Sequence, residues 1–337
     1  HFILHFDTIE RVCLSMKRTI AIVIVFLCIP PLYSAKINYC ERMRELVINI
    51  SKEAKKHNPE FIIIGQNALE LLTINGKPTG KHANNYCDAM DAIGIEELFW
   101  GYHKQGVQTP MKITHYYLSY LAIFNNYKKP VLVIDYVNNE KQAYHSFIQS
   151  SQRGFLSFQT NLQCSIIPQW IHNKNEDAVR ELSHAKNFLY FINPQNHTTI
   201  DSFINTVALT WYDVIIVDAF FWGIPLTNDD VHRLQKKPNG ARRLVIAYMS
   251  VGEAEDYRYY WKAGWEKLKP QFLEQENKLW KGNYKVRYWD TQWHEILYGN
   301  GNEELFGDSY LGRVIAAGFD GVYMDVLDAA LYFQEKK

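Results

Sequence analysis

An excess of charge of one sign is absent from this sequence. Its 337 residues carry 36 lysines and arginines against 36 aspartates and glutamates, so the formal net charge is zero. Lysine and arginine form no run longer than a pair. Proteins that bind nucleic acid usually present a basic run or a basic surface. The composition therefore gives no indication of a nucleic-acid partner.

Motifs for metals, nucleotides and activated nucleophiles are also missing. The 12 histidines form no HExxH or HxH cluster, and the chain has no GxSxG elbow, P-loop or GxGxxG loop. After residue 35 the cysteines are Cys40, Cys87 and Cys164, without a CxxC pair. Three cysteines allow one disulfide at most, and the sequence does not choose its partners. We therefore expect no metal and no cofactor.

Long apolar runs are confined to the N-terminus. From Met16 the chain reads MKRTIAIVIVFLCIPPLYSA, with two basic residues before an apolar stretch at 20–29. This pattern predicts a secretory signal peptide over 16–35, because the apolar stretch is short for a membrane span. We expect a secreted or periplasmic protein with no stable membrane insertion after leader cleavage, and an uncleaved anchor is the alternative. Residues 1–15 contain no methionine and are expected to be an upstream remnant.

Eight apolar runs predict strands. Most are continuous rather than alternating, as in parallel strands that helices cover on both faces. Helical patterns occur at Arg42–His57, Asp229–Lys237 and Trp261–Gln275. This alternation predicts an α/β fold, a (β/α)8 TIM-type barrel over 36–337, with a doubly wound open sheet as the alternative. The expected strands are Phe61–Gly65, Ala92–Ile95, Val131–Tyr136, Phe188–Ile192, Val214–Asp218, Leu244–Ser250, Lys285–Trp289 and Val322–Asp325.

Every expected strand ends in or near a polar residue. In a parallel barrel the carboxyl ends of the strands meet at one mouth, where catalytic groups lie. The alternative for each residue is capping of the next helix, above all for the two aspartates Asp218 and Asp290. The strand-end residues are Gln66, Asn67, Glu96, Glu97, Asp135, Asn193, Asp218, Glu253, Asp290 and Asp325.

Six segments carry a resemblance to one known family. Three are long: Ala247–Trp261 (AYMSVGEAEDYRYYW), Trp280–Asp290 (WKGNYKVRYWD) and Gly318–Phe333 (GFDGVYMDVLDAALYF). Three are shorter: Phe61–Leu72, Asp91–Tyr102 and Val131–Val137. All resemble the extracellular glycoside hydrolase family 114 and its bacterial and archaeal relatives. That group includes endo-α-1,4-polygalactosaminidases and folds as a (β/α)8 barrel. The resemblance implies a hydrolase of an amino-sugar polysaccharide.

The order of these segments differs from the family's order. The family's barrel opens with a strand like FLYFINPQ and reaches one like GVYMDVLDA as strand five. Here strands six to eight come first, within 36–168, a connector follows at 169–186, and strands one to five occupy 187–337. We therefore predict a circularly permuted barrel, because termini that lie close together at a surface can be rejoined without loss of the core. A rearranged gene, or two half-barrels exchanged between chains, is the alternative.

Glycoside hydrolysis usually needs two carboxyl groups that flank the scissile bond. By resemblance, the family's acidic motif after strand five falls on Asp325 and Asp328. Val326 stands between them, where many members carry a polar residue. The second carboxylate, at the end of strand seven, falls on Glu96, with Glu97 as the alternative. We expect Asp325 to act as nucleophile or base and Glu96 as general acid.

Further residues are expected to bind the substrate, with packing or capping at the barrel rim as the alternative. An acidic mouth would attract a cationic polymer such as a partly deacetylated galactosamine chain. A catalytically silent barrel that binds extracellular polysaccharide is the alternative function. The expected substrate-binding residues are Asp328, Glu253, Asp256, Asn67, Asp135, Asp218, Asp290, Tyr248 and Trp289.

Overall fold

The structure, a computed structural model, describes residues 37–336. The predicted upstream remnant and signal peptide lie outside these residues. Within 37–336, no helix combines the length and the apolar character that a membrane crossing requires.

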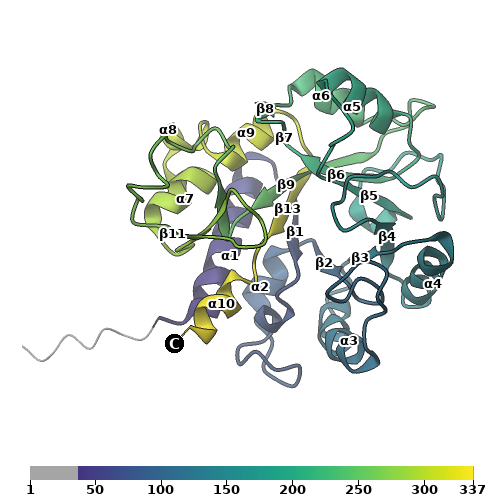
Figure 1. The fold of residues 1–337 in the computed structure, drawn as a ribbon, viewed down its shortest axis with the longest axis horizontal. Coiled ribbons are helices and arrows are strands. Elements are labelled where there is room, and N and C mark those ends of the chain that lie inside the picture. Colours follow the sequence, from purple (N-terminus) through teal and green to yellow (C-terminus); the bar gives the residue numbers. More distant parts are fainter. Residues whose placement is uncertain (1–36, 337) are drawn as a thin grey trace, which may run out of the picture. The chain divides into compact units, whose positions relative to one another are not determined.

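Eight parallel strands form the central sheet. They are arranged around a common axis with helices on the outside (Figure 1), which confirms the predicted α/β barrel. The two edge strands of the sheet are the fourth and fifth in chain order, so the barrel is nearly closed. In spatial order the strands are β4 (Leu156–Thr160), β3 (Val131–Tyr136), β2 (Ala92–Glu96), β1 (Ile62–Gln66), β13 (Gly321–Asp325), β9 (Leu244–Ser250), β6 (Val214–Asp218) and β5 (Phe188–Phe191).

One predicted strand is wrong. Lys285–Trp289 is not part of the barrel, and it overlaps only the end of β12 (Asn283–Val286) in a small antiparallel sheet. The eighth barrel strand is β4, with the sequence LSFQT. This strand was not predicted because it contains polar residues. Gln159 is polar and nevertheless buried, because its Nε2 donates a hydrogen bond to Ser146 Oγ at 3.1 Å. Four barrel strands, not three, therefore precede the connector.

Helices cover the outside of the barrel. The pattern at 261–275 does not form the predicted helix, because Gly264 adopts a φ of +93° and the segment continues as turns into β11 (Leu273–Glu276). The other two predictions are confirmed by α1 (Tyr39–His57) and α6 (Asn228–Leu234). The remaining α-helices of the described chain are α2 (Asn84–Ala89), α3 (Met111–Asn125), α4 (Glu140–Ser151), α5 (Ile200–Ala208), α7 (Thr291–Tyr298), α8 (Glu303–Phe306), α9 (Tyr310–Ala316) and α10 (Ala329–Glu335).

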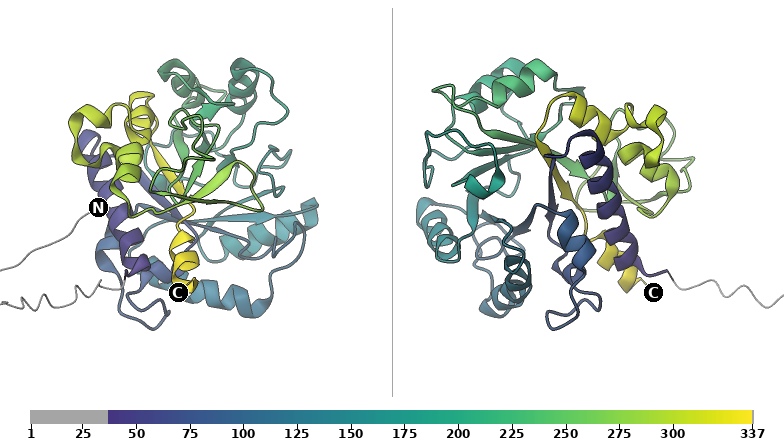
Figure 2. Two further views of the ribbon diagram at one scale, coloured as in Figure 1. Left: turned by 60° about the vertical axis from the view of Figure 1, so that its left-hand side comes forward. Right: turned by 180° about the vertical axis from the view of Figure 1, so that it is seen from behind.

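Helix α1 brings the first and last described elements together. Asn38 caps the helix by accepting a hydrogen bond from the Glu41 N–H, and basic residues occupy its last turn, where they suit the helix dipole. Its apolar face, which includes Leu46 and Ile50, is buried. α1 contacts α2 on one side and α10 on the other (Figure 2). The start and the end of the barrel therefore lie side by side, between β13 and β1.

The connector at 169–186 is fixed to the end of the barrel opposite the mouth. It contains no strand, only the short 3₁₀ turn η2 (Leu182–His184). Asn175 donates from Nδ2 to the Asp213 carboxylate at 3.0 Å. The Lys237 ammonium donates to Asp213 at 2.6 Å and to the Asn175 carbonyl oxygen at 2.9 Å. Lys237 and Asp213 have no exposed side-chain surface, so this network anchors the connector in the interior.

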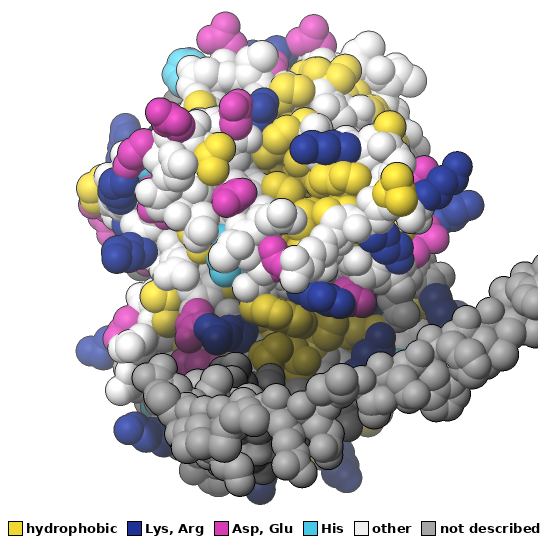
Figure 3. Space-filling view, turned by 90° about the vertical axis from the view of Figure 1, so that its left-hand side faces the viewer, with side chains coloured by type: hydrophobic (Ala, Val, Ile, Leu, Met, Phe, Trp, Pro, Cys, Tyr) yellow, Lys and Arg dark blue, Asp and Glu magenta, His cyan; other side chains and the backbone are white. Residues whose placement is uncertain are grey.

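Two insertions follow the carboxyl ends of β6 and β9. The first is a hairpin of β7 (Phe220–Phe221) and β8 (Ile224–Pro225). The second is the antiparallel sheet in which β12 lies between β10 (Glu253–Glu255) and β11. On the face that carries α7 and α8, at the left of Figure 1, hydrophobic side chains gather between charged ones (Figure 3). Both insertions belong to the mouth of the barrel.

Candidate active site

A cavity of about 470 Å³ opens at the carboxyl ends of the barrel strands. Strand ends form most of its lining, and β10 and β12 form one wall. Seven carboxyl groups line it against two lysines, Lys281 and Lys285, so the cavity is acidic. The acidic residues of the lining are Glu96, Glu97, Asp218, Glu253, Glu255, Asp325 and Asp328.

Buried tyrosines surround the base of the cavity. Tyr136, Tyr190 and Tyr248 line it, and Tyr323 lies beneath, with its ring centroid 5.2 Å from that of Tyr190. Gly94 makes room for Tyr323, because a Cβ at this position would collide with the tyrosine side chain. Among the described residues, the Tyr323 hydroxyl has no hydrogen-bond partner. These rings exclude water around any charged group at the base.

Glu96 ends β2 and is held on both carboxylate oxygens. The Tyr136 hydroxyl donates to Oε1 and Asn67 Nδ2 donates to Oε2 at 2.9 Å. In return, the Glu96 backbone N–H donates to Asn67 Oδ1 at 3.0 Å. Asn67 adopts a φ of +56°, a conformation that asparagine tolerates better than most residues. Burial raises the pKa of Glu96, and the hydrogen bonds from Tyr136, Asn67 and Gln66 offset part of this rise.

Asp325 ends β13 and is held in a similar way. Oδ2 accepts a hydrogen bond from the Tyr248 hydroxyl at 2.7 Å, and Oδ1 accepts one from the Val326 N–H at 2.6 Å. Burial, followed by the charge of Glu96, raises the pKa of Asp325 to about 8. Val326 adopts a φ of +63°, which is rare for a β-branched residue. Strain of this kind collects at functional sites.

Glu96 and Asp325 face each other across one strand. β1 pairs with β13 on one side and with β2 on the other. Neighbouring strands lie ~4.8 Å apart, so the two strands that carry the carboxyl groups are roughly 10 Å apart. Two interacting buried carboxyl groups do not both ionise readily near neutral pH. The pair therefore holds one proton over much of this range, as one acid and one carboxylate.

The two strands that carry this pair were predicted, but their positions in the barrel differ from the predicted ones. Counted around the barrel from β5, Asp325 lies on the fourth strand and Glu96 on the sixth. The prediction was the fifth and the seventh. The difference has the same cause as the wrong strand above. Residues 285–289 were counted as the fourth strand but lie outside the barrel, so each later strand moves one place forward and β4 becomes the eighth.

A buried ion-pair network forms the wall beside β6. Arg258 donates to both oxygens of Asp218, at 2.7 and 2.8 Å, and from Nε to Glu255 at 2.5 Å. Only 1% of the Arg258 side chain is exposed. Arg258 therefore pairs with Glu255 in its own segment and with Asp218 at the end of β6. One guanidinium thus fixes two carboxylates at the cavity wall, with a net negative charge.

A second ion pair fixes the wall next to α10. Glu253 accepts hydrogen bonds from Lys285 Nζ at 3.1 Å and from Asn277 Nδ2 at 2.9 Å. Asp328 is exposed toward solvent, but the surrounding cavity wall partly desolvates its carboxyl group and raises its pKa, and the charge of Lys285 offsets part of this rise. Asp328 lies at the start of α10, but its side chain makes no capping hydrogen bond. The side chain is therefore available to the cavity.

The structure brings seven of the predicted site residues to the cavity, and they do not all face it equally. These are Asp325, Glu96, Asp328, Glu253, Asn67, Asp218 and Tyr248, together with the alternative Glu97. Burial, followed by the charge of Glu96, raises the pKa of Glu97 to about 7.

Four predicted substrate-binding residues do not line the cavity, which corrects those expectations. Asp135 is fully buried behind the barrel, where it accepts hydrogen bonds from the Ser146 hydroxyl at 2.6 Å and from the backbone. Asp290 caps α7 by accepting from the Gln292 N–H. Trp289 packs against other aromatic rings at α1 and α10. Asp256 is exposed beside the turn at Gly282.

The sequence reasoning placed Asp135 in the cavity, where Tyr136 lies instead, and it missed Glu255. Tyr136 directly follows Asp135, and neighbouring residues of a strand point to opposite faces. This alternation predicts that only one of Asp135 and Tyr136 faces the cavity, but it does not predict which one. Glu255 lies in the quoted EAEDYR motif two residues after Glu253, on the same face of β10. Because alternate residues of a strand share a face, the prediction that Glu253 lines the cavity also applies to Glu255.

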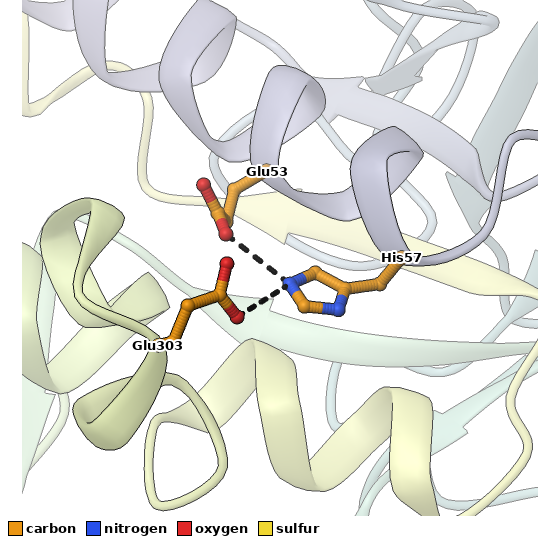
Figure 4. A group of neighbouring side chains, drawn as sticks. All are labelled: Glu53, His57 and Glu303. Atoms are coloured by element: carbon orange, nitrogen blue, oxygen red, sulfur yellow. Dashed lines mark hydrogen bonds and ion pairs between the residues drawn. The ribbon is translucent and has the colours of Figure 1, made fainter.

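A separate cluster of possible metal ligands lies outside the cavity. Glu53 and His57 on α1 and Glu303 on α8 each offer one ligand atom, all within 4.8 Å of one another (Figure 4). The Lys56 ammonium pairs with both carboxylates. The His57 ring stacks on Phe306 with centroids 3.8 Å apart. Because a lysine already neutralises these carboxylates, we assign the cluster to the packing of α8 on α1.

Comparisons with known proteins bear on this site. Uncharacterized proteins of three microorganisms are similar to parts of the chain. The protein of Methanocaldococcus jannaschii is 33% identical over 165 residues, 48% of this chain and 43% of its own length. That of Deinococcus radiodurans is 39% identical over 127 residues, 37% and 36% of the two lengths. That of Thermotoga maritima is 42% identical over 91 residues, 27% and 25%. The chain thus spans less than half the length of these curated relatives.

A family model also matches the chain. The matched residues, 190–336, begin in β5 and end one residue after α10. They contain Asp325 and Asp328, whereas Glu96 lies outside them. Residues 190–336 of this chain are therefore similar to glycoside-hydrolase family GH114.

Proposed function

We propose that this protein is an exported glycoside hydrolase that cleaves an amino-sugar polysaccharide of the polygalactosamine type. The observation that carries the proposal is the pair of half-buried carboxyl groups, Glu96 and Asp325, in one cavity at the mouth of a parallel barrel. The similarity of residues 190–336 to a glycoside-hydrolase family supports the reaction class. The leader pattern at 16–35 supports export.

In the proposed reaction, Glu96 protonates the oxygen of the leaving sugar while Asp325 attacks the anomeric carbon or activates a water molecule. This chemistry needs one protonated and one ionised carboxyl group at the start of each cycle. The pair holds one proton near neutral pH, and because the pKa of Asp325 is raised to about 8 this proton lies on Asp325 in the free protein. The proposed roles therefore require the proton to move to Glu96 when substrate binds. Tyr136 and Asn67 hold Glu96, and Tyr248 holds Asp325, so both groups are oriented before substrate binds.

The acidic lining supports an amino-sugar substrate. Asp218 and Glu255 share one guanidinium, so their part of the wall keeps a net negative charge. An amino group on the sugar would be attracted to this wall. Neutral sugars would gain hydrogen bonds there but no charge attraction.

We also propose that the strand order is circularly permuted relative to the family. The family match begins in β5, directly after the connector, and the neighbouring positions of α1 and α10 support a cut at this point. In this arrangement β1 to β4, which include Glu96, would correspond to the family's C-terminal half.

The test is cleavage of defined polymers. The secreted protein would be incubated with α-1,4-linked galactosamine polymer and its N-acetylated form, and new reducing ends would be counted. We expect the variants Glu96→Gln and Asp325→Asn to lose about 10³-fold or more in kcat. Asp290→Asn makes the same charge change outside the cavity and, because asparagine also caps helices, should keep wild-type activity.

A catalytically silent barrel that binds polysaccharide is the second candidate. The apolar Val326, between the two aspartates of the family motif, favours it, because many members carry a polar residue there. Binding of either polymer without any release of reducing ends would establish this second candidate. Loss of both binding and cleavage would reject both functions.

A further inference from the structure

The β7–β8 hairpin exposes a tryptophan in a strained backbone conformation. Trp222 adopts a φ of +50°, and 63% of its surface is exposed. Glycine is the residue that usually occupies this conformation, and a bulky residue there is uncommon. A strained position that also presents a large apolar side chain to solvent indicates a role in binding.

Trp222 lies at the rim of the cavity. Its indole Nε1–H donates to the His197 carbonyl oxygen at 3.3 Å, in the loop that follows β5. The hairpin itself follows Asp218, the cavity residue at the end of β6. The indole therefore bridges the loops after β5 and β6, and this hydrogen bond fixes its edge.

The hairpin is continuous with the cavity wall through Tyr257. A Cβ on Gly223, next to Trp222, would lie 3.3 Å from the Tyr257 carbonyl oxygen, so the two segments are in close contact. Tyr257 lines the cavity and is 52% exposed. Its hydroxyl donates to Glu255 Oε1 at 2.6 Å, which fixes the direction of the ring.

A third exposed ring lies on the same insertion as Tyr257. Trp280, in the turn between β11 and β12, lines the cavity and is 52% exposed. Polar side chains of the lining lie near this turn, among them Asn277 and Lys281. Separate ring faces with polar groups between them suit pyranose rings, which have apolar C–H faces and polar edges. A protein partner would instead favour one contiguous apolar patch.

We infer that Trp222, Tyr257 and Trp280 form an aromatic rim that binds sugar units of the polymer beyond the scissile bond. This inference rests on the proposed function. It adds that the substrate is a polysaccharide chain long enough to extend out of the cavity and reach Trp222. Trp222 is the distal member, because it does not line the cavity itself. It acts in substrate binding and does not touch the reacting atoms.

The consequence is a dependence on chain length. β6 lies two strands from β13 in the sheet, so the hairpin starts roughly 10 Å around the rim from the strand of Asp325. A short oligosaccharide bound at the carboxyl pair would not extend to Trp222, whereas a polymer would. Loss of the indole should therefore raise KM for the polymer and leave kcat near its original value.

The test uses three single variants of the full chain. Trp222→Gly removes the ring and allows the left-handed conformation without strain. Trp222→Phe keeps an aromatic face. Ile224→Ala removes an exposed apolar side chain from the same hairpin and serves as the matched control. For each variant, kcat and KM are measured on α-1,4-linked galactosamine polymer and on its trisaccharide, and polymer binding is measured by calorimetry in an Asp325→Asn background.

We expect Trp222→Gly to lower the ratio of polymer to trisaccharide kcat/KM about tenfold, mostly through KM. Trp222→Phe should retain most of the ratio, and Ile224→Ala should match the wild type. An unchanged ratio in Trp222→Gly would overturn the inference, and so would an equal loss in Ile224→Ala. If the wild type binds polymer without cleaving it, the proposed hydrolase fails, and the calorimetric comparison of the same variants still decides the role of the rim.

Discussion

Replacing Asp325 by asparagine should stabilise the protein at neutral pH while abolishing its activity. In the folded protein, burial and Glu96 raise the pKa of Asp325 from an ordinary value of 3.8 to about 8. Between these values the folded state holds a proton that the unfolded chain has released. Stability therefore falls as the pH rises through this window, and the full cost of the buried charge is present above pH 8.

The size of the effect follows from the same two values. At pH 7, about three units above the ordinary pKa, the cost is at most ~4 kcal/mol. The side-chain oxygen of asparagine can still accept a hydrogen bond from the Val326 N–H. Its NH2 group cannot accept the hydrogen bond that the Tyr248 hydroxyl now donates to the second carboxylate oxygen. A poorer hydrogen bond offsets about 1–2 kcal/mol of the gain. We therefore expect Asp325→Asn to raise the free energy of unfolding by roughly 2 kcal/mol at pH 7.

Urea unfolding at pH 4, 7 and 8.5, followed by tryptophan fluorescence, measures this directly. The gain should be present at pH 7 and 8.5 and absent at pH 4, where Asp325 costs little. Asp290→Asn, which changes a helix cap outside the cavity, should show no such pH dependence. A gain of the same size at all three pH values, or a loss at pH 7, would refute the account of Asp325 as a buried, charge-strained group.

Four further predictions concern the same cavity. kcat should follow a bell-shaped pH profile that falls above about pH 8, where Glu96 and Asp325 both ionise, and an alkaline plateau would contradict the shared proton. Gly94→Ala should lower the melting temperature, since the new methyl group collides with the side chain of Tyr323. Arg258→Met should destabilise by about 3–5 kcal/mol in urea unfolding, because it leaves two carboxylates buried without their cation. Val326→Gly should stabilise by up to ~1 kcal/mol in the same assay, and a loss would show that the valine side chain outweighs its backbone strain.

The barrel could be predicted because its signal is local. Continuous apolar runs such as those of β3 and β6 require burial on both faces, and amphipathic segments such as α1 supply the cover. β4 could not be predicted in this way, because Gln159 is polar and is buried through a hydrogen bond to Ser146 of α4. The permuted order and the leader remain predictions from the sequence.

For the site, the sequence by itself determined which strands end in carboxylates, and Asp325 and Glu96 follow from that. Only the tertiary structure decided which of these groups meet. Whether Asp135 or Tyr136 faces the cavity depends on how β3 is rotated in the barrel, and two-residue alternation leaves both choices open. The pairing of Arg258 with Asp218, 40 residues away, and the position of Trp222 at the rim depend on how two insertions fold over the mouth. Such contacts join segments far apart in the chain, so no local pattern in the sequence records them.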